Sequence, residues 1–239
     1  MPRFFVPSVA EDTITVTGQD ASHIRRSLRM MVGETLTVCD GCGTDCLCEI
    51  QEFAGEDVLL RVLSRALSES EPTCAVTLYQ GLPKADKMEW IIQKAVEIGV
   101  TRIVPVQMAR SVAVINEKSA KKAARWQKIA DEAAGQSGRG VLPVVEEPIS
   151  FAVAAKRLAG ENTVVCYECG GKPFAASAGR DTKALSLVVG PEGGIDAREI
   201  ATLEEGGAVI ATLGKRILRC ETAPVAALSV LMAITGNME

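Results

Sequence analysis

Hydrophobic and polar residues alternate along much of the first 70 residues of this chain, and such alternation predicts short β-strands. The alternating segments lie at residues 13–17, 34–39, 46–53 and 57–63. Glycine-containing turn pairs separate the last three segments, and a helical period at residues 23–30, capped by Asp20 or Ser22, interrupts the strands. The pattern therefore predicts a small barrel or sheet.

Beyond a polar, proline-marked linker at residues 64–73, the apolar positions change to alternating strand and helix periods. Strands are expected at residues 74–79, 102–106, 141–145, 163–167, 185–189 and 208–212, and helices at residues 86–98, 119–134, 150–158, 196–205 and 222–234. Strands that alternate with helices are typical of an α/β domain with a mainly parallel sheet. Two domains are expected, at residues 1–70 and 73–239.

The composition is that of an ordinary globular protein, with 47% hydrophobic and 23% charged residues. No apolar stretch approaches the ~20 residues of a membrane-spanning helix. The first residues also lack the charged start and apolar run of an export signal. We therefore expect a cytoplasmic protein that does not act on membranes.

The eight cysteines are expected to be reduced thiols, because nothing in the sequence indicates export. Four of them, Cys39, Cys42, Cys46 and Cys48, have a spacing that resembles a zinc site. No histidine lies near them, and the last two fall on one face of an alternating strand. No metal is expected, although the spacing leaves zinc open.

Basic residues are unevenly distributed in a chain whose net charge is −4. Residues 1–72 hold 6 basic and 12 acidic side chains, whereas residues 73–239 hold 20 and 18. The basic residues of the second region are concentrated at 102–139, which carries Arg102, Arg110, Lys118, Lys121, Lys122, Arg125, Lys128 and Arg139. This region is compatible both with a nucleic-acid surface and with a solvated helix face.

Two glycine-rich turns, at residues 187–196 and 213–222, carry the most distinctive chemistry of the chain. Each follows an apolar strand and precedes a helix. In the first, Gly190, Gly193 and Gly194 allow positive φ angles or close approach of a ligand to the backbone. The spacing fits neither a dinucleotide fingerprint nor a phosphate loop, and Glu192 would repel a phosphate. A cationic ligand, or an adenine bound by backbone groups, suits this turn better.

Ligands of open α/β sheets bind at the carboxyl ends of the strands. The turns that follow residues 167, 189 and 212 are all expected at that edge, and together they would form one composite pocket. Arg219 and Glu221 would lie at its border.

At this point the residues match a known family. Leu-Val-Val-Gly-Pro-Glu-Gly-Gly-Ile at 187–195 and Leu-Gly-Lys-Arg-Ile-Leu-Arg-Cys-Glu-Thr-Ala at 213–223 resemble the RsmE family of 16S ribosomal RNA (uridine-N3) methyltransferases in the SPOUT superfamily. Further segments occur in the family's order, at residues 2–5, 23–30, 84–89, 93–99, 125–128 and 136–139. The resemblance thus covers nearly the whole chain.

The resemblance implies an N-terminal PUA-like β-barrel that binds RNA and a C-terminal SPOUT α/β domain that ends in a trefoil knot. It also implies a homodimer that binds S-adenosyl-L-methionine in the knot loops and methylates N3 of a uridine in 16S rRNA of the small ribosomal subunit. The residues expected to bind this cofactor are Tyr167, Gly190, Glu192, Gly193, Gly194, Leu213, Gly214, Ile217, Leu218 and Cys220.

The expected reaction also defines candidate catalytic residues. Uridine N3 becomes nucleophilic only as its proton leaves, so a group must take this proton or stabilise the charge that develops on uracil. Arg219 is the candidate for the second task, whereas Glu192 and Glu221 are both candidates for the base. The residues expected to contact RNA are Arg3, Arg26, Arg29, Lys84, Lys87, Arg110 and Arg139.

Two alternative functions remain open at the level of the sequence. A methyltransferase of the same superfamily could act on tRNA or on a ribose 2′-OH. The chain could also be a binding protein and not an enzyme, namely a non-catalytic RNA-binding protein with a zinc-stabilised barrel.

Overall fold

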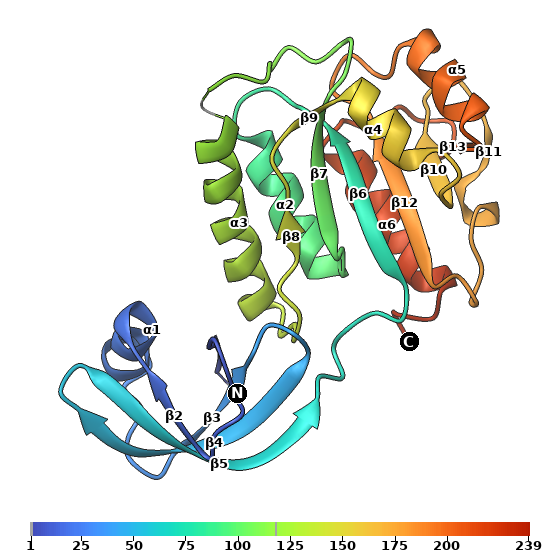
Figure 1. Ribbon diagram of the computed structural model, residues 1–239. Helices are drawn as coiled ribbons and strands as arrows, with labels where there is room; N and C mark the ends of the chain where they lie inside the picture. The colour runs from blue at the N-terminus through green and yellow to red at the C-terminus, as the bar shows by residue number, and fades with distance from the viewer. Residues whose placement is uncertain (1, 118) are drawn as a thin grey trace. The chain divides into compact units, whose positions relative to one another are not determined.

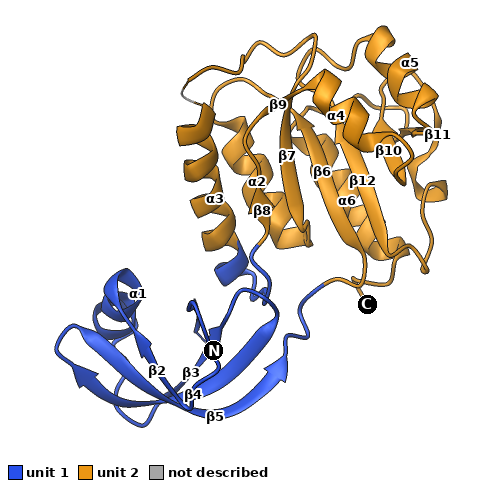
Figure 2. Ribbon diagram, viewed as in Figure 1, with its two compact units in different colours: residues 1–71, 134–142 blue, residues 72–133, 143–239 orange. Residues whose placement is uncertain are grey.

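The computed structural model describes residues 2–117 and 119–239, which fall into two compact units (Figure 2). Unit 1 comprises the residues up to 71 together with residues 134–142, and unit 2 comprises residues 72–133 and 143–239. The return of residues 134–142 to unit 1 differs from the expected division into 1–70 and 73–239. Hydrogen bonds hold this segment in unit 1, because Gly140 accepts from the N–H of Gly43 at 3.0 Å and donates to Glu71 Oε1 at 2.9 Å. The packing is close, since a Cβ on Gly140 would lie 2.2 Å from Ser68 Cβ.

The sheet of unit 1 contains five strands in the order β1-β3-β4-β5-β2. The strands are β1 (Arg3–Phe5), β2 (Thr13–Val16), β3 (Thr35–Cys39), β4 (Thr44–Ala54) and β5 (Asp57–Leu67). All pairs are antiparallel except β1 with β3. The expected alternation is present, because Val38, Cys46, Cys48 and Leu60 are fully buried in one core.

Three details of unit 1 differ from the sequence-based expectations. Strand β1 was not predicted, and residues 64–67 continue β5 instead of starting the linker because they pair with residues 44–47 of β4. The helical segment begins earlier than expected, as α1 (Gly18–Ser22) followed by the π-helical turn η1 (His23–Ser27). Its N-cap is Thr17, not Asp20 or Ser22, and it ends before Arg29, whose φ is 53°.

The sheet of unit 2 is parallel throughout, as the alternation of strands and helices predicted. Its order is β11-β13-β10-β12-β6-β7-β8, and β9 also pairs with β7. The strands are β6 (Ala75–Gly81), β7 (Arg102–Gln107), β8 (Val144–Val145), β9 (Ile149–Ser150), β10 (Thr163–Cys166), β11 (Lys172–Pro173), β12 (Ala184–Val189) and β13 (Val209–Thr212). The strand expected at 141–145 is therefore limited to its last two residues.

Helices cover both faces of this sheet (Figure 1). They are α2 (Lys87–Ile98), α3 (Ser119–Gln136), α4 (Phe151–Leu158), α5 (Ala197–Glu205) and α6 (Thr222–Ile234), with a short 3₁₀ turn, η2 (Phe174–Ala176). Helices α2 and α6 pack against each other, as do α4 and α5. Gly99 ends α2 with a φ of 117°, and Asp196 with Glu199 forms a capping box at the start of α5, both as predicted. None of the described helices is long and apolar enough to cross a membrane.

Candidate functional site

The three turns predicted to form one pocket do meet in unit 2. Cys166 at the end of β10 is in register with Val189 of β12 and with Ala211 of β13, so the chain leaves all three strands at the same level. A cavity of about 480 Å³ lies among the turns that follow. This volume is within the range of small-molecule and cofactor sites, ~300–1,000 Å³.

All ten residues predicted to bind the cofactor line this cavity. They come from the turn after β10, the glycine-rich turn after β12 and the turn after β13. Other lining residues are Lys87, Cys166, Glu168, Val189, Pro191, Thr212, Lys215, Arg216, Arg219 and Ala223. The structure thus brings the residues together, whereas their contact with a cofactor stays a prediction.

Backbone packing explains why the first turn is rich in glycine. A Cβ on Gly190 would lie 2.8 Å from Ile195 Cγ1, and a Cβ on Gly193 would lie 3.0 Å from Arg110 Cβ. Gly194 has a φ of 72°, which L side chains rarely adopt. Beneath the turn, a Cβ on Gly81 would lie 2.5 Å from the backbone nitrogen of Pro191. The turn is therefore packed closely against the end of β6.

Arg110, for which an RNA contact stays a prediction, contacts the first turn in the structure. Its guanidinium donates to the carbonyl of Gly193 at 3.1 Å and pairs with Asp196 at 3.3 Å. The neighbouring backbone N–H of Ala109 donates to Glu199 Oε1 at 2.8 Å. The loop after β7 and the start of α5 therefore fix the turn from outside the cavity.

Lys87, also expected to contact RNA, lies at the wall of the cavity in an ionic cluster. Its Nζ is 3.1 Å from Glu192 Oε1 and 3.2 Å from Glu221 Oε2. The backbone N–H of Lys84 also donates to Glu192, at 3.1 Å. Lys87 begins α2, Glu192 belongs to the first glycine-rich turn, and Glu221 is the N-cap residue of α6. One ammonium group thus connects three elements of unit 2.

These contacts keep both carboxylates charged. Burial alone would raise the pKa of Glu192, but hydrogen bonds from its own backbone, from Lys84 and from Lys87 outweigh burial and lower it. The pKa of Glu221 is lowered in the same way, with burial opposed chiefly by a hydrogen bond from the Cys220 thiol and by Lys87. Hydrogen bonds to Glu192 and Glu221 in turn raise the pKa of Lys87. A carboxylate with a lowered pKa is a weak base.

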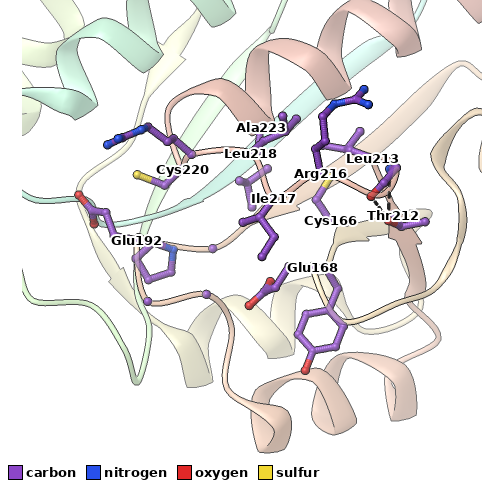
Figure 3. A pocket seen from close by; sticks show the side chains of 18 of the residues that line it. Cys166, Glu168, Glu192, Thr212, Leu213, Arg216, Ile217, Leu218, Cys220 and Ala223 are labelled. Carbon is purple, nitrogen blue, oxygen red and sulfur yellow. Dashed lines mark hydrogen bonds between the residues drawn. The ribbon is translucent and has the colours of Figure 1, made fainter.

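The cavity contains the thiol of Cys220, which was predicted to bind the cofactor, and the carboxylate of Glu168, which the sequence did not single out. Cys220 is buried, and burial followed by its hydrogen bond to Glu221 raises its pKa to about 12, so its thiol is neutral. Glu168 follows Tyr167, and a Cβ on Gly194 would lie 2.1 Å from its Oε1. Figure 3 shows Glu192 beside Cys220 and Glu168 on the other side of Ile217. The position of Glu168 directly after a buried strand end is the signal that could have identified it.

Arg219 also lines the cavity, and its side chain is exposed to solvent. Its backbone carbonyl accepts hydrogen bonds from the N–H groups of Thr222 and Ala223 at 2.9 Å, which fixes it to the start of α6. Gly214 precedes it in the same turn with a φ of 105°. The backbone of Arg219 is therefore fixed, whereas its guanidinium is exposed at the border of the cavity.

The other residues expected to contact RNA differ in their exposure. Arg26 and Arg29 of unit 1 and the side chain of Lys84 in unit 2 are exposed. Arg3 forms two hydrogen bonds of 2.7 Å with Asp45, and its side chain is only 15% exposed. Arg139 is 3% exposed and pairs with Glu71 at 2.6 Å. Arg139 thus has the environment of a structural residue of unit 1.

All four arginines at residues 102–139 are engaged in ion pairs. Besides Arg110 and Arg139, Arg102 pairs with Glu146 at 2.8 Å and Arg125 with Glu89 at 2.9 Å. The lysines of α3 are exposed, and Lys118 lies outside the described residues. The exposed lysines remain compatible both with a solvated helix face and with an RNA surface.

The cysteine spacing does not produce a metal site in the described part of the chain, where no three His, Cys, Asp or Glu side chains are grouped as metal ligands. Cys39, Cys46 and Cys48 are buried thiols, and Cys42 is exposed. Burial raises the pKa of Cys39 and of Cys48 to about 11. Thiols in this state are protonated at neutral pH and pack as small apolar side chains.

Two protein-family models match the chain. Residues 69–232 match an RNA methyltransferase domain, and residues 16–63 match an RNA methyltransferase PUA domain. The first match spans most of unit 2, including the cavity, and the second lies in unit 1.

Proteins with similar sequences and structures agree with these matches. Ribosomal RNA small subunit methyltransferase E of Bacillus subtilis (strain 168) is 38% identical over 97% of this chain and 96% of that protein. The Synechocystis protein of the same name is 33% identical over 95% of this chain and 75% of its own length. The crystal structure of a ribosomal RNA small subunit methyltransferase E from Neisseria gonorrhoeae bound to S-adenosyl methionine is 30% identical. It superposes with a TM-score of 0.87 and covers 98% of this chain and 97% of that one.

Proposed function

Because this chain belongs to the ribosomal RNA small subunit methyltransferase E family, we propose that it transfers the methyl group of S-adenosyl-L-methionine to N3 of a specific uridine in 16S rRNA. The observation that carries the proposal is the cavity at the ends of β10, β12 and β13. It lies within the region that matches the RNA methyltransferase domain, and the related Neisseria gonorrhoeae protein has been solved with this methyl donor.

The residues of the cavity fit S-adenosyl-L-methionine. Its volume suits a ligand of this size, and the glycines at 190, 193, 194 and 214 leave backbone N–H and C=O groups accessible for an adenine and a ribose. Leu213, Ile217 and Leu218 supply the apolar wall. The bound cofactor supplies an activated methyl group on a cationic sulfur.

Arg219 is proposed to bind uracil. During transfer the bond from carbon to sulfur breaks, a bond from carbon to N3 forms, and the N3 proton leaves, so negative charge develops on uracil O2 and O4. A guanidinium remains charged and donates to such oxygens. Glu192 and Glu221 were candidates for the base, but their lowered pKa values make them weak bases. We propose that the proton passes to solvent at the exposed side of Arg219.

The finer features implied by family membership are part of the same proposal. Unit 1 would be a PUA-like barrel that contacts RNA phosphates through Arg26 and Arg29, with Lys84 contributing from unit 2. Arg3, Lys87, Arg110 and Arg139 are left out of this set because carboxylates engage their side chains. The parallel order β12-β10-β13, with the chain passing on into α6, is compatible with a trefoil knot. A cytoplasmic homodimer acting on the small subunit completes the proposal.

The substrate is tested with purified protein, radiolabelled S-adenosyl-L-methionine and 30S subunits from a strain that lacks the gene. Nucleoside analysis should then show labelled 3-methyluridine in 16S rRNA. A labelled 2′-O-methyl nucleoside, or label in tRNA alone, would instead favour another methyltransferase of the same superfamily. Naked 16S rRNA serves as a second substrate, to show whether the assembled subunit is needed.

The roles within the site are tested by two substitutions. Arg219→Ala should lower kcat about a hundredfold while cofactor affinity stays within a few-fold, because the side chain acts on uracil. Gly193→Val should weaken cofactor binding more than about tenfold, because its side chain would clash with Arg110 and displace the turn that lines the cavity. An equal loss of cofactor affinity in both variants would contradict this division of roles.

A further inference from the structure

The ionic cluster of Lys87, Glu192 and Glu221 has a composition that the transfer step itself does not explain. Its members lie far apart in the sequence and converge on one ammonium group, with both N–O distances at 3.1–3.2 Å. Each of the three side chains is 22–32% exposed, so the cluster is partly shielded from water without being buried. Of its two carboxylates, that of Glu192 lines the cavity directly.

The cluster carries one negative charge in excess. One ammonium and two carboxylates sum to −1, and the adjoining Cys220 thiol is neutral because burial raises its pKa to about 12. Among the described residues, Lys87 is the cation that forms ion pairs with these two carboxylates. The cluster is therefore negative at neutral pH, while the turn after β13 contributes the cations Lys215, Arg216 and Arg219 to the same cavity.

The position of Lys87 in its own helix is unfavourable for a positive charge, so contacts within the cluster, not the helix, stabilise a lysine at this position. Lys87 is the first residue of α2, where the partial positive charge of the helix N-terminus disfavours a cation. Two carboxylates from other elements compensate for this local disadvantage. Lys87 is thus a positioning residue that holds Glu192 and Glu221 together in their charged form.

We infer that this cluster makes the cavity select the cationic methyl donor over the neutral product, S-adenosyl-L-homocysteine. The inference rests on the proposed function. Donor and product share their adenine, ribose and amino-acid groups, so contacts to those groups bind both equally. They differ in one methyl group and in the positive charge on sulfur. The net negative charge of the cluster attracts that positive charge in the donor and finds no such charge in the product. Loss of that charge on transfer weakens product binding and favours its release.

The test measures the dissociation constants of donor and product by isothermal titration calorimetry with the full chain at about pH 8. Glu192→Gln keeps the shape of the side chain and removes its charge, so the preference for the donor should fall about fivefold. Lys87→Met removes the positive charge and should raise the preference about twofold. Glu204→Gln is the matched control, because Glu204 is an exposed carboxylate of α5 that does not line the cavity.

Shifts of opposite sign in the two variants distinguish electrostatic selection from structural damage, which would weaken both ligands alike. An unchanged preference in Glu192→Gln, shifts in the same direction, or an equal effect of Glu204→Gln would overturn the inference. If Lys87→Met instead lowers the salt dependence of RNA binding and leaves the ligand preference unchanged, Lys87 contacts phosphate and the inference fails. If the unmodified protein binds neither ligand, the proposed function itself fails.

Discussion

Each unit of the molecule contains a cluster of basic and acidic side chains, and the two clusters differ in charge balance and surroundings. In unit 1, Arg3 pairs with Asp45 and Arg139 with Glu71, so two positive and two negative groups balance. Arg139 also connects the two pairs, because its backbone carbonyl accepts a hydrogen bond of 3.1 Å from Arg3. In unit 2, the cluster around Lys87 has one excess negative charge and borders a cavity.

This difference shows why residue type alone does not identify a nucleic-acid contact. Arg3, Lys87 and Arg139 were all expected to bind RNA, yet each has a carboxylate partner within 3.2 Å. A balanced, shielded cluster stabilises its unit, whereas an unbalanced cluster at a cavity wall can act on a ligand. Charge balance and burial therefore separate the two roles.

The largest expected effect concerns the balanced cluster. Glu71→Ala should lower the free energy of unfolding by about 3–5 kcal/mol, because the guanidinium of Arg139 is 3% exposed and would lose its carboxylate. The backbone N–H groups of Gly140 and Val141 would lose the same acceptor. Urea unfolding measures the change.

Glu49→Ala is the control for this prediction. Glu49 pairs with Arg61 in the same unit, but the Arg61 side chain is 55% exposed, so the loss should stay below about 1 kcal/mol. Similar losses in both variants would show that burial does not distinguish the unit 1 cluster from a surface pair.

A smaller effect is expected where backbone packing sets the geometry of the unit 2 cluster. Gly81→Ala would place a Cβ 2.5 Å from Pro191 and displace the adjacent Glu192, so the free energy of unfolding should fall by about 1–3 kcal/mol. Cofactor affinity measured by calorimetry should fall as well. Gly179→Ala is the control, since no atom lies within 4 Å of its Cβ position. A stable variant with normal affinity would show that the turn tolerates displacement.

The exposed arginines of unit 1 should affect RNA binding and leave stability unchanged. The double substitution Arg26→Ala and Arg29→Ala should reduce the slope of log affinity against log salt by about 1.4, or ~0.7 for each single-strand phosphate that the variant no longer binds. Filter binding at several salt concentrations measures the slope. An unchanged slope would remove these residues from the proposed RNA-binding surface.

The smallest effect is expected on the stability of the folded protein at acid pH. Glu192 and Glu221 have pKa values below the ordinary 4.5, so the unfolded chain binds their protons more tightly than the folded protein does. Their contribution to stability is thus complete above pH 4.5 and is lost as the pH falls through the folded-state values. The double variant Glu192→Gln and Glu221→Gln should flatten this acid loss in thermal unfolding. An identical acid slope in both proteins would contradict the lowered pKa values.

The sequence predicted much of the fold because its signals are local. Hydrophobic periods identified the helices of unit 2 and its strands other than the two-residue β9 and β11. Asp196 with Glu199 and Gly99 marked helix ends that the structure confirms. The misses depend on pairing between distant segments. Strand β1 has three residues, and the last residues of β5 begin with the polar pair Ser64 and Arg65, so only their hydrogen-bonding partners reveal them as strands.

For the site, the sequence by itself determined which turns form the cavity, because alternating strands and helices predict a parallel sheet, and such a sheet brings the carboxyl ends of its strands together. It could not determine which charged side chains meet, since Lys87 lies far along the chain from both of its carboxylates. Only the tertiary structure decided that Lys87 belongs to the cavity wall and Arg139 to the interior of unit 1. The physical reason is that the function of a charged group depends on its burial and its partners, and folding sets both.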